Sequence, residues 1–346
     1  MIQYENSIIE EIITHFVGNK VQEDGVIISK APVSQTEELR FVLRRYLLSS
    51  FDTEESWHFS HSGGDVEFNY IYGLCREVFR DPSCVYEKSV EMAKFLYEKS
   101  EQNKIKAGDF SVVFFREVML DGDSLEAIGL FKSEEKDTFL KVVNLGSTLN
   151  LETEKGINTH KLDKGALIFN TKREDGYIVK VVDNTNKSDA RYWNEDFLGL
   201  ASCQNEYSNT KHAMAMAKNF VTKELPKEYE ISKNDQITLL GKTLEYFKGN
   251  EEFSMDNFSQ EVFGDPEVAD TFSRYKEQYE ARNDIHIEDS FGISGPACER
   301  QQRVYKRVIK LDNNVRIYIS GKRDNVVQGE DEYGKFYKVY YQEESI

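Results

Sequence analysis

The sequence is poor in cysteine and proline and contains no long uncharged apolar run. Its 346 residues include only 4 Cys and 5 Pro. The cysteines form no CxxC pair, and their wide spacing suits neither a zinc site nor a redox pair, so we interpret them as reduced thiols of a cytoplasmic protein. No stretch of about 18 uncharged apolar residues occurs, which excludes a membrane-spanning helix. Residues 1–16 lack the basic and apolar segments of a signal peptide.

Signature motifs of nucleotide binding and nucleophilic catalysis are also missing. The chain has no GxxxxGK[ST], no strand-linked GxGxxG and no GxSxG. We therefore expect no cofactor and no enzymatic activity of these kinds. His58 and His61 form an H-x-x-H pair, but the glycines that follow place it at the junction of a strand and a loop. That context is typical of a turn rather than of a zinc site.

The chain does have enough apolar side chains for a sizeable core. Apolar residues make up 39% of it and include 22 Phe and 19 Tyr, which excludes disorder throughout. The 21 Gly are too few for a collagen-like architecture. The formal net charge is −17, because 61 acidic residues outnumber 44 Lys and Arg. Such a protein does not coat DNA with its whole surface, so any nucleic-acid contact requires a local basic patch.

Residues 1–105 are predicted to form a mostly helical N-terminal portion. Apolar residues at helical spacing indicate a first helix: Ile9, Ile12, Ile13 and Phe16. Ser34 and Glu37 fit a capping box before a second helix, and a further helix is expected from Cys84 to Ser100. Between them, the segments Gly25–Ser29 and Ser56–Ser60 are predicted to be short strands.

Residues 106–190 are predicted to form an antiparallel sheet. Runs rich in Val, Ile and Phe cover Phe110–Met119, Ser124–Lys132, Thr138–Leu145, Gly165–Thr171 and Tyr177–Asp183. Turn signals such as Asp121-Gly122 separate several of these runs. The short polar connections leave no room for crossover helices, so we expect the strands to pair as a meander.

Residues 191–346 are predicted to form a second helical portion that ends in a basic β-hairpin. Helical spacing returns after Asn184, and Asp265-Pro266 is a typical helix start. The hairpin is expected from Tyr305–Leu311 and Val315–Ser320, with Asn313-Asn314 in the turn. The sequence thus predicts an α+β protein in which a central antiparallel sheet is flanked by N-terminal and C-terminal helical portions.

Charge is divided unevenly along the last hundred residues. Residues 250–289, the acidic segment, hold twelve acids and three bases. Residues 300–323, the basic segment, carry a net charge of +7 in 24 residues, and everything outside this segment carries −24. The cations of the basic segment are Arg300, Arg303, Lys306, Arg307, Lys310, Arg316, Lys322 and Arg323.

The basic segment has three interpretations. Clustered Lys and Arg bind phosphates by releasing condensed counterions, and Tyr305 and Tyr318 could flank a backbone or stack on an unpaired base. Alternatively, the cations neutralise the acidic segment or form the solvated face of a hairpin whose apolar residues point inward. A third reading is that the segment binds an acidic protein.

Two stretches of sequence together resemble a known family. The first comprises Asp109–Phe115, Leu125–Lys132 and Thr138–Val143, and the second comprises Thr271–Tyr279, Ile285–Ile293 and Arg307–Ile317. Their order resembles the bacterial nucleoid-associated protein family of the 37-kDa type, over most of the chain after the first hundred residues. The resemblance implies a cytoplasmic protein found with the compacted chromosome and without an established enzymatic activity. It carries over no catalytic or base-reading residue.

Three functional hypotheses follow. The leading one is a non-enzymatic nucleoid-associated protein that contacts DNA through the basic segment, or that reaches the nucleoid through a protein partner. The second is a metal-dependent nuclease using carboxylates of the central sheet, with Asp109, Glu117 and Lys141 as candidates. The third is an interaction scaffold whose acidic segment binds a basic partner. None of them involves a membrane, and self-association stays open.

Overall fold

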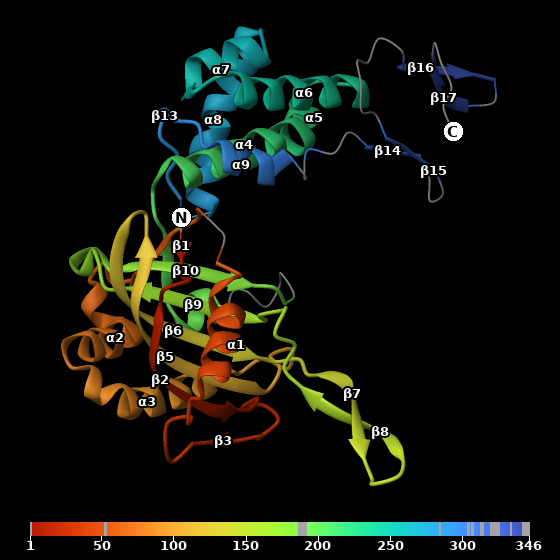
Figure 1. The fold of residues 1–346 in the computed structure, drawn as a ribbon. Helices are drawn as coiled ribbons and strands as arrows, with labels where there is room; N and C mark the ends of the chain where they lie inside the picture. Colours follow the sequence, from red (N-terminus) through yellow and green to blue (C-terminus); the bar gives the residue numbers. More distant parts are fainter. Residues whose placement is uncertain are drawn as a thin grey trace. The chain divides into compact units, whose positions relative to one another are not determined.

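The chain forms two compact units, Met1–Cys203 (unit 1) and Gln204–Ile346 (unit 2). Figure 1 shows the fold of this computed structural model. The structure describes residues 2–51, 54–185, 192–283, 285–302, 305, 308–311, 315–318, 326–332 and 334–340.

A large antiparallel sheet organises unit 1. In the part of the chain that the structure describes, nine strands pair in the order β11-β4-β10-β9-β6-β5-β2-β3, with β1 also beside β5. Their bounds are β1 (Ile2–Gln3), β2 (Ile8–Val17), β3 (Val26–Ile27), β4 (Trp57–Phe59), β5 (Gly108–Leu120), β6 (Asp123–Ser133), β9 (Lys164–Phe169), β10 (Ile178–Asp183) and β11 (Leu200–Ser202). The predicted α+β class with a large antiparallel sheet is therefore confirmed.

Both faces of this sheet are covered by helices, so its central strands are apolar on both sides. Val112 and Phe114 of β5 pack with α2 (Tyr70–Arg80) and α3 (Val85–Lys99). Val113 and Phe115 point to the opposite face and pack with α1 (Glu37–Leu48). This alternation with period two places α1 on one face and α2 and α3 on the other, as Figure 1 shows.

The turn between β5 and β6 shows why the sequence specifies this hairpin. Leu120 pairs with Asp123, so Asp121 and Gly122 alone connect the strands. Their φ angles are 53° and 101°. Two-residue hairpin turns of this kind need positive φ at both central positions, which Asp-Gly tolerates well. The predicted antiparallel pairing is confirmed here and for β6 with β9 and β9 with β10.

The helix predicted around residues 9–16 is wrong, because Ile8–Val17 is strand β2, paired with β5. Its register shifts between Ile9 and Glu11, so Glu10 is an extra residue. This bulge puts Ile9 and Ile12 on the face of α1, although residues three apart in a regular strand lie on opposite faces. The bulge thus imitates helical spacing in the sequence. The N-terminal hundred residues therefore contribute a long strand to the sheet.

One predicted run leaves the sheet. Residues 137–144 form β7 (Asp137–Asn144), which pairs antiparallel with β8 (Leu149–Gly156), a strand that was not predicted. In the described part of the chain these two strands pair only with each other. The meander predicted for residues 109–183 therefore holds for the neighbouring strands, while the β7–β8 ribbon (residues 137–156) extends away from the sheet (Figure 1).

Short helical turns complete unit 1 at several strand ends. They are η1 (Val66–Phe68), η2 (Pro82–Cys84), η3 (Arg173–Asp175) and the π-helix η4 (Tyr192–Phe197). Trp193 and Phe197 of η4 are buried with the α2 and α3 side of the core. The first cap differs from the sequence prediction, since the side chain of Thr36, not Ser34, accepts a hydrogen bond from the Leu39 N–H and begins α1.

Unit 2 is built from helices around an aromatic core. The helices are α4 (Glu206–Asn219), the π-helix η5 (Phe220–Glu224), α5 (Leu225–Glu228), α6 (Lys233–Gly249), α7 (Met255–Val262), α8 (Pro266–Asn283) and α9 (Gly295–Gln302). A small sheet pairs β12 (Glu252–Ser254) with β13 (Ser290–Gly292), and it stacks Phe253 on Phe291 at 4.7 Å between ring centroids. Phe258 and Phe272 extend this cluster. The predicted helix start at Asp265-Pro266 is confirmed as the start of α8.

Two further strand pairs follow α9. β14 (Val308–Leu311) pairs antiparallel with β15 (Val315–Tyr318), and β16 (Val326–Asp331) pairs with β17 (Gly334–Val339). The residues predicted for the turn between β14 and β15, Asn313-Asn314, lie outside the described residues. The complete C-terminal hairpin therefore stays a prediction.

The stability of unit 1 is expected to fall in mild acid because of His15 on β2. His15 is buried, its Nδ1 accepts the Ser29 N–H at 3.1 Å, and its Nε2 lies 2.9 Å from Ser89 Oγ. Burial lowers the pKa of His15. The unfolded chain therefore takes up this proton more readily, and stability is lost as the pH falls from about 6.5 through the lower folded pKa. Urea unfolding at about pH 7.5 and pH 5 should show a smaller pH effect for His15→Gln than for the wild type; equal effects would contradict this role.

Candidate nucleic-acid interface

The basic segment starts on the last helix of unit 2. Arg300 is an exposed residue in the last turn of α9, while Ala297 and Cys298 of the same helix are buried. A cation in the last turn of a helix is favoured by the partial negative charge of the helix C-terminus. The helix C-terminus therefore favours a cation at the position of Arg300.

Tyr305 lies shortly after α9 and is part of the core of unit 2. The interpretation that its ring flanks or stacks on a nucleic acid is therefore wrong. Its exposed fraction is only 4%, and its hydroxyl donates a hydrogen bond to the Met214 carbonyl of α4. Burial raises the pKa of Tyr305 well above its usual range. The ring packs in the core of unit 2, because a phenol with an internal acceptor is more stable there than in water. The basic segment is thus attached to the helical core near its start.

Two of the predicted cations occupy partner positions in a strand pair. Lys310 of β14 is the register partner of Arg316 of β15. The strand pairing therefore places these two positions next to each other.

Five further cations were predicted to belong to the site. Arg303, Lys306, Arg307, Lys322 and Arg323 are all outside the described residues. Tyr318 ends β15. The structure brings Lys310 and Arg316 together by register and places Arg300 on α9.

Several glutamates of the acidic segment face solvent in unit 2. Glu261, Glu267 and Glu277 are exposed residues of α7 and α8 or of their ends. Lys276, by contrast, is nearly buried and pairs with Asp289 and, at 3.9 Å, with Glu280. The acidic segment therefore neutralises one of its own lysines, and the three glutamates named above are not buried against the basic segment.

The residues predicted for a metal nuclease do not meet. Asp109 at the start of β5 pairs with Lys136 at 3.0 Å, and Glu117 lies eight residues further along that strand, about 26 Å away at 3.3 Å per residue. Lys141 lies on β7, outside the sheet. Among the described residues, no group of three or more His, Cys, Asp or Glu could hold a metal ion. The predicted constellation of these three residues is therefore wrong.

The H-x-x-H pair lies at a strand end, as its sequence context predicts. His58 belongs to β4, and its Nδ1 lies 3.0 Å from the carbonyl oxygen of Phe59. His61 follows in a turn, where its Nδ1 accepts the Gly63 N–H at 3.2 Å. Both rings therefore interact with nearby backbone, which is the behaviour of turn histidines.

Two lysines that sequence patterns do not single out are fully buried in unit 1. Lys132 of β6 and Lys164 of β9 are register partners, and each has an exposed fraction of 0%. Both ammonium groups approach the ring of Tyr192, at 5.4 Å and 5.3 Å from its centroid. In the sequence each lysine only adjoins an apolar run, a signal too common to be specific.

Each of these lysines is neutralised by protein groups. Lys164 Nζ donates to both carboxylate oxygens of Asp183, at 3.0 and 2.9 Å. Lys132 Nζ lies 3.2 Å from Glu134 Oε1 and donates to the Lys106 carbonyl at 2.6 Å. Burial lowers the pKa of Lys132. Since both ammonium groups have internal partners, we interpret the cluster as a structural ion-pair network rather than an anion-binding site.

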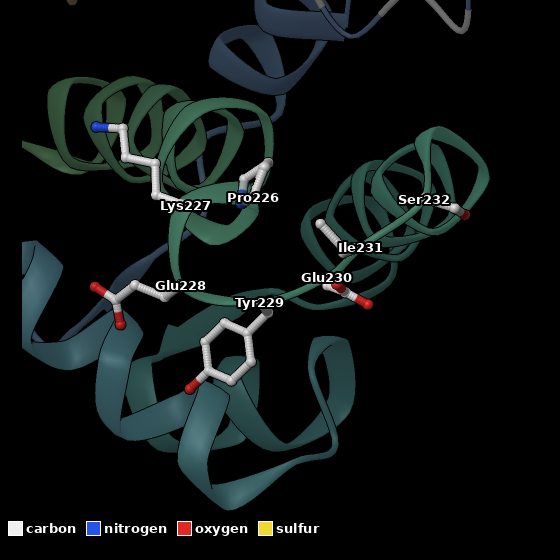
Figure 2. A pocket seen from close by; sticks show the side chains of 7 residues that line it. All are labelled: Pro226, Lys227, Glu228, Tyr229, Glu230, Ile231 and Ser232. Carbon is white, nitrogen blue, oxygen red and sulfur yellow. The ribbon is translucent and has the colours of Figure 1, made fainter.

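The polar side chains around a surface hollow in unit 2 do not point toward a common centre (Figure 2). It is lined by the consecutive residues Pro226–Ser232, between α5 and α6. Figure 2 shows that the charged side chains of Lys227, Glu228 and Glu230 point in different directions. Lys227 pairs with Glu224, and the Tyr229 hydroxyl lies 3.1 Å from Thr271 Oγ1. A ligand site needs polar groups that converge on one point, so we assign no function to this hollow.

Comparison with protein families identifies a relationship for nearly the whole chain. A family model described as nucleoid-associated protein YejK matches residues 13–346. The chain belongs to this nucleoid-associated protein family. The resemblance drawn from the sequence is thereby confirmed, and the family match includes unit 2 with the entire basic segment.

No curated protein matches the chain. Within the described residues, no helix combines the length and apolar character needed to cross a membrane.

Proposed function

We propose that this protein is a non-enzymatic, cytoplasmic member of the nucleoid that binds DNA directly through the basic segment. The observation that carries the proposal is the charge of that segment, +7 in 24 residues of a chain whose net charge is −17. Membership of a nucleoid-associated family makes DNA the polyanion that this charge is expected to meet. The eight cations named above are the proposed contacts.

Three features of the fold support this proposal. Lys310 of β14 and Arg316 of β15 are register partners, so two of the proposed contacts occupy neighbouring positions. Tyr305 attaches the basic segment to the helical core of unit 2. The exposed glutamates of the acidic segment would be repelled by DNA. The strongly negative remainder of the chain therefore restricts the contact to the basic segment and sets its orientation.

DNA binding is expected to depend steeply on salt and weakly on sequence. If about four of the cations contact phosphates, log K falls against log salt with a slope of about −3.6. Affinity then drops about 150-fold between about 50 and 200 mM salt. Fluorescence anisotropy with duplexes of different sequence, titrated at several salt concentrations, measures both properties.

The same titration separates direct from indirect association. A slope near zero, or no binding at low salt, would contradict direct binding and would leave attachment through a protein partner. Contacts to phosphates alone carry little sequence information, so a large preference for one duplex would contradict the proposed mode. Because we propose that the protein has no enzymatic activity, we expect the oligonucleotides to be recovered intact after incubation with Mg²⁺.

A further inference from the structure

The β7–β8 ribbon carries an apolar face that is open to solvent. The register of the two strands places eight residues on one face: Thr138, Leu140, Val142, Asn144, Leu149, Leu151, Thr153 and Lys155. The exposed fractions of Leu140, Val142, Leu149 and Leu151 are 69%, 62%, 74% and 63%. Leu145, at the tip, is 60% exposed. A contiguous patch of large apolar side chains on a protruding element marks an interaction surface.

The opposite face of the ribbon is built differently. Lys141 and Glu154 form an ion pair at 2.7 Å there, and the Phe139 ring lies over Gly156, where a Cβ would come within 2.9 Å of it. Glu152 and Asn150 are also on this side. An aromatic ring that covers a cross-strand glycine stabilises a pair of strands. One face therefore holds the ribbon together, while the other exposes its apolar residues.

The charge of the ribbon argues against DNA as the occupant of this face. Residues 137–156 hold three acids and two bases, for a net charge of −1. Protein arms that enter a DNA groove use Lys, Arg or other donors to reach phosphates and bases. The eight residues of the apolar face include a single charge, Lys155, at the base of the ribbon. The face is therefore suited to a protein surface with the same apolar character.

We propose that the apolar face of the β7–β8 ribbon joins two copies of this chain in a symmetric dimer. A second copy presents an identical apolar face, so the contact is self-complementary, as an isologous interface requires. In an antiparallel stack, the Leu140–Thr153 and Val142–Leu151 pairs lie at the centre. Lys155 of each copy lies at the rim, near the tip of its partner. This gives the apolar centre and polar rim that protein interfaces have.

The antiparallel arrangement also separates the charges of the two molecules. Each chain carries a net charge of −17, which opposes close approach of two copies. Stacking the ribbons with tip against base puts the two unit 1 sheets at opposite ends of the contact. The nearly neutral ribbons then meet without the repulsion that contact between the larger acidic surfaces would bring.

The apolar area that two ribbons can bury against each other is small for a permanent dimer. A fully buried Leu or Val removes on the order of 60–120 Å² of apolar surface from water. Four such residues per copy, each about two-thirds exposed, give on the order of 300–650 Å² in total, to which the threonines and the Lys155 stem add. Specific interfaces begin near about 1,000 Å². The ribbon therefore fits a weak dimer that forms in the micromolar range rather than a permanent one.

Sedimentation of the full chain without DNA tests this dimer. Analytical ultracentrifugation from about 1 to about 200 µM should show a concentration-dependent shift from monomer to dimer. Sulfate should strengthen the association, because apolar burial is favoured by excluded salts. A monomer at every concentration would overturn the proposal.

A matched pair of variants locates the contact. Leu151→Glu should weaken the dimer at least about 100-fold, because each dimer carries the change twice. Asn150→Glu adds the same charge one residue away on the opposite face and should leave the association nearly unchanged. Equal weakening by both variants, or by neither, would overturn the face assignment. Circular dichroism checks that both variants stay folded.

Discussion

Replacing Arg303, Lys306 and Arg307 by glutamate is expected to weaken DNA binding at least about 100-fold at low salt. The change removes three of the proposed phosphate contacts and adds three negative charges to a chain that already carries −17. The salt dependence should flatten as well, from a slope of about −3.6 toward zero, because fewer cations remain to release counterions from the phosphates. The anisotropy titration described above measures both effects.

The matched control reverses the same charge elsewhere in unit 2. Lys233, Lys242 and Lys248 are exposed residues of α6, and their change to glutamate alters the net charge by the same amount. If the basic segment makes the contact, the α6 variant keeps most of the affinity and the original slope. If the variant with glutamate at positions 303, 306 and 307 is folded and binds DNA as tightly as the wild type, the basic segment is not the DNA-binding surface. Association through a protein partner would then be favoured. Equal loss in both variants would indicate only the effect of net charge.

Lys164→Met is expected to destabilise unit 1 by about 3–5 kcal/mol, because it leaves the Asp183 carboxylate nearly buried without its cation. Lys164 is fully buried, and the Asp183 side chain is only 9% exposed. Urea unfolding followed by tryptophan fluorescence reports this loss selectively. The chain has 2 Trp, Trp57 and Trp193, and both belong to unit 1. We expect the unfolding midpoint to fall by about 1 M or more.

Two further variants show whether the buried charge is the cause. Lys164→Met combined with Asp183→Leu should recover much of the lost stability, since replacing a whole buried pair by apolar residues costs little. Lys141→Met breaks a pair with Glu154 in which both side chains are about half exposed, so it should cost no more than about 1 kcal/mol. If Lys164→Met and Lys141→Met cost the same, the buried network would not have the structural role assigned to it.

Much of the fold follows from local sequence signals. Asp121-Gly122 supplies the positive φ angles of a two-residue hairpin turn, and Asp265-Pro266 begins α8 as expected. The pairing of β2 could not be obtained in this way. Its bulge at Glu10 gives Ile9 and Ile12 the spacing of a helix face, and only the neighbouring strand β5 reveals the extra residue. A local pattern cannot distinguish a bulged strand from a helix when both place the same residues on one side.

The sequence by itself determined the family resemblance and the separation of charge between residues 250–289 and 300–323, since charge content is a local sum that does not depend on folding. The tertiary structure decided which side chains are available. Tyr305, which under one interpretation of the sequence could stack on a nucleic acid, is buried against α4. The apolar residues of β7 and β8, typical of a core strand, are exposed because these strands leave the sheet. Burial depends on partners distant in the sequence, and for this reason only the folded chain could assign it.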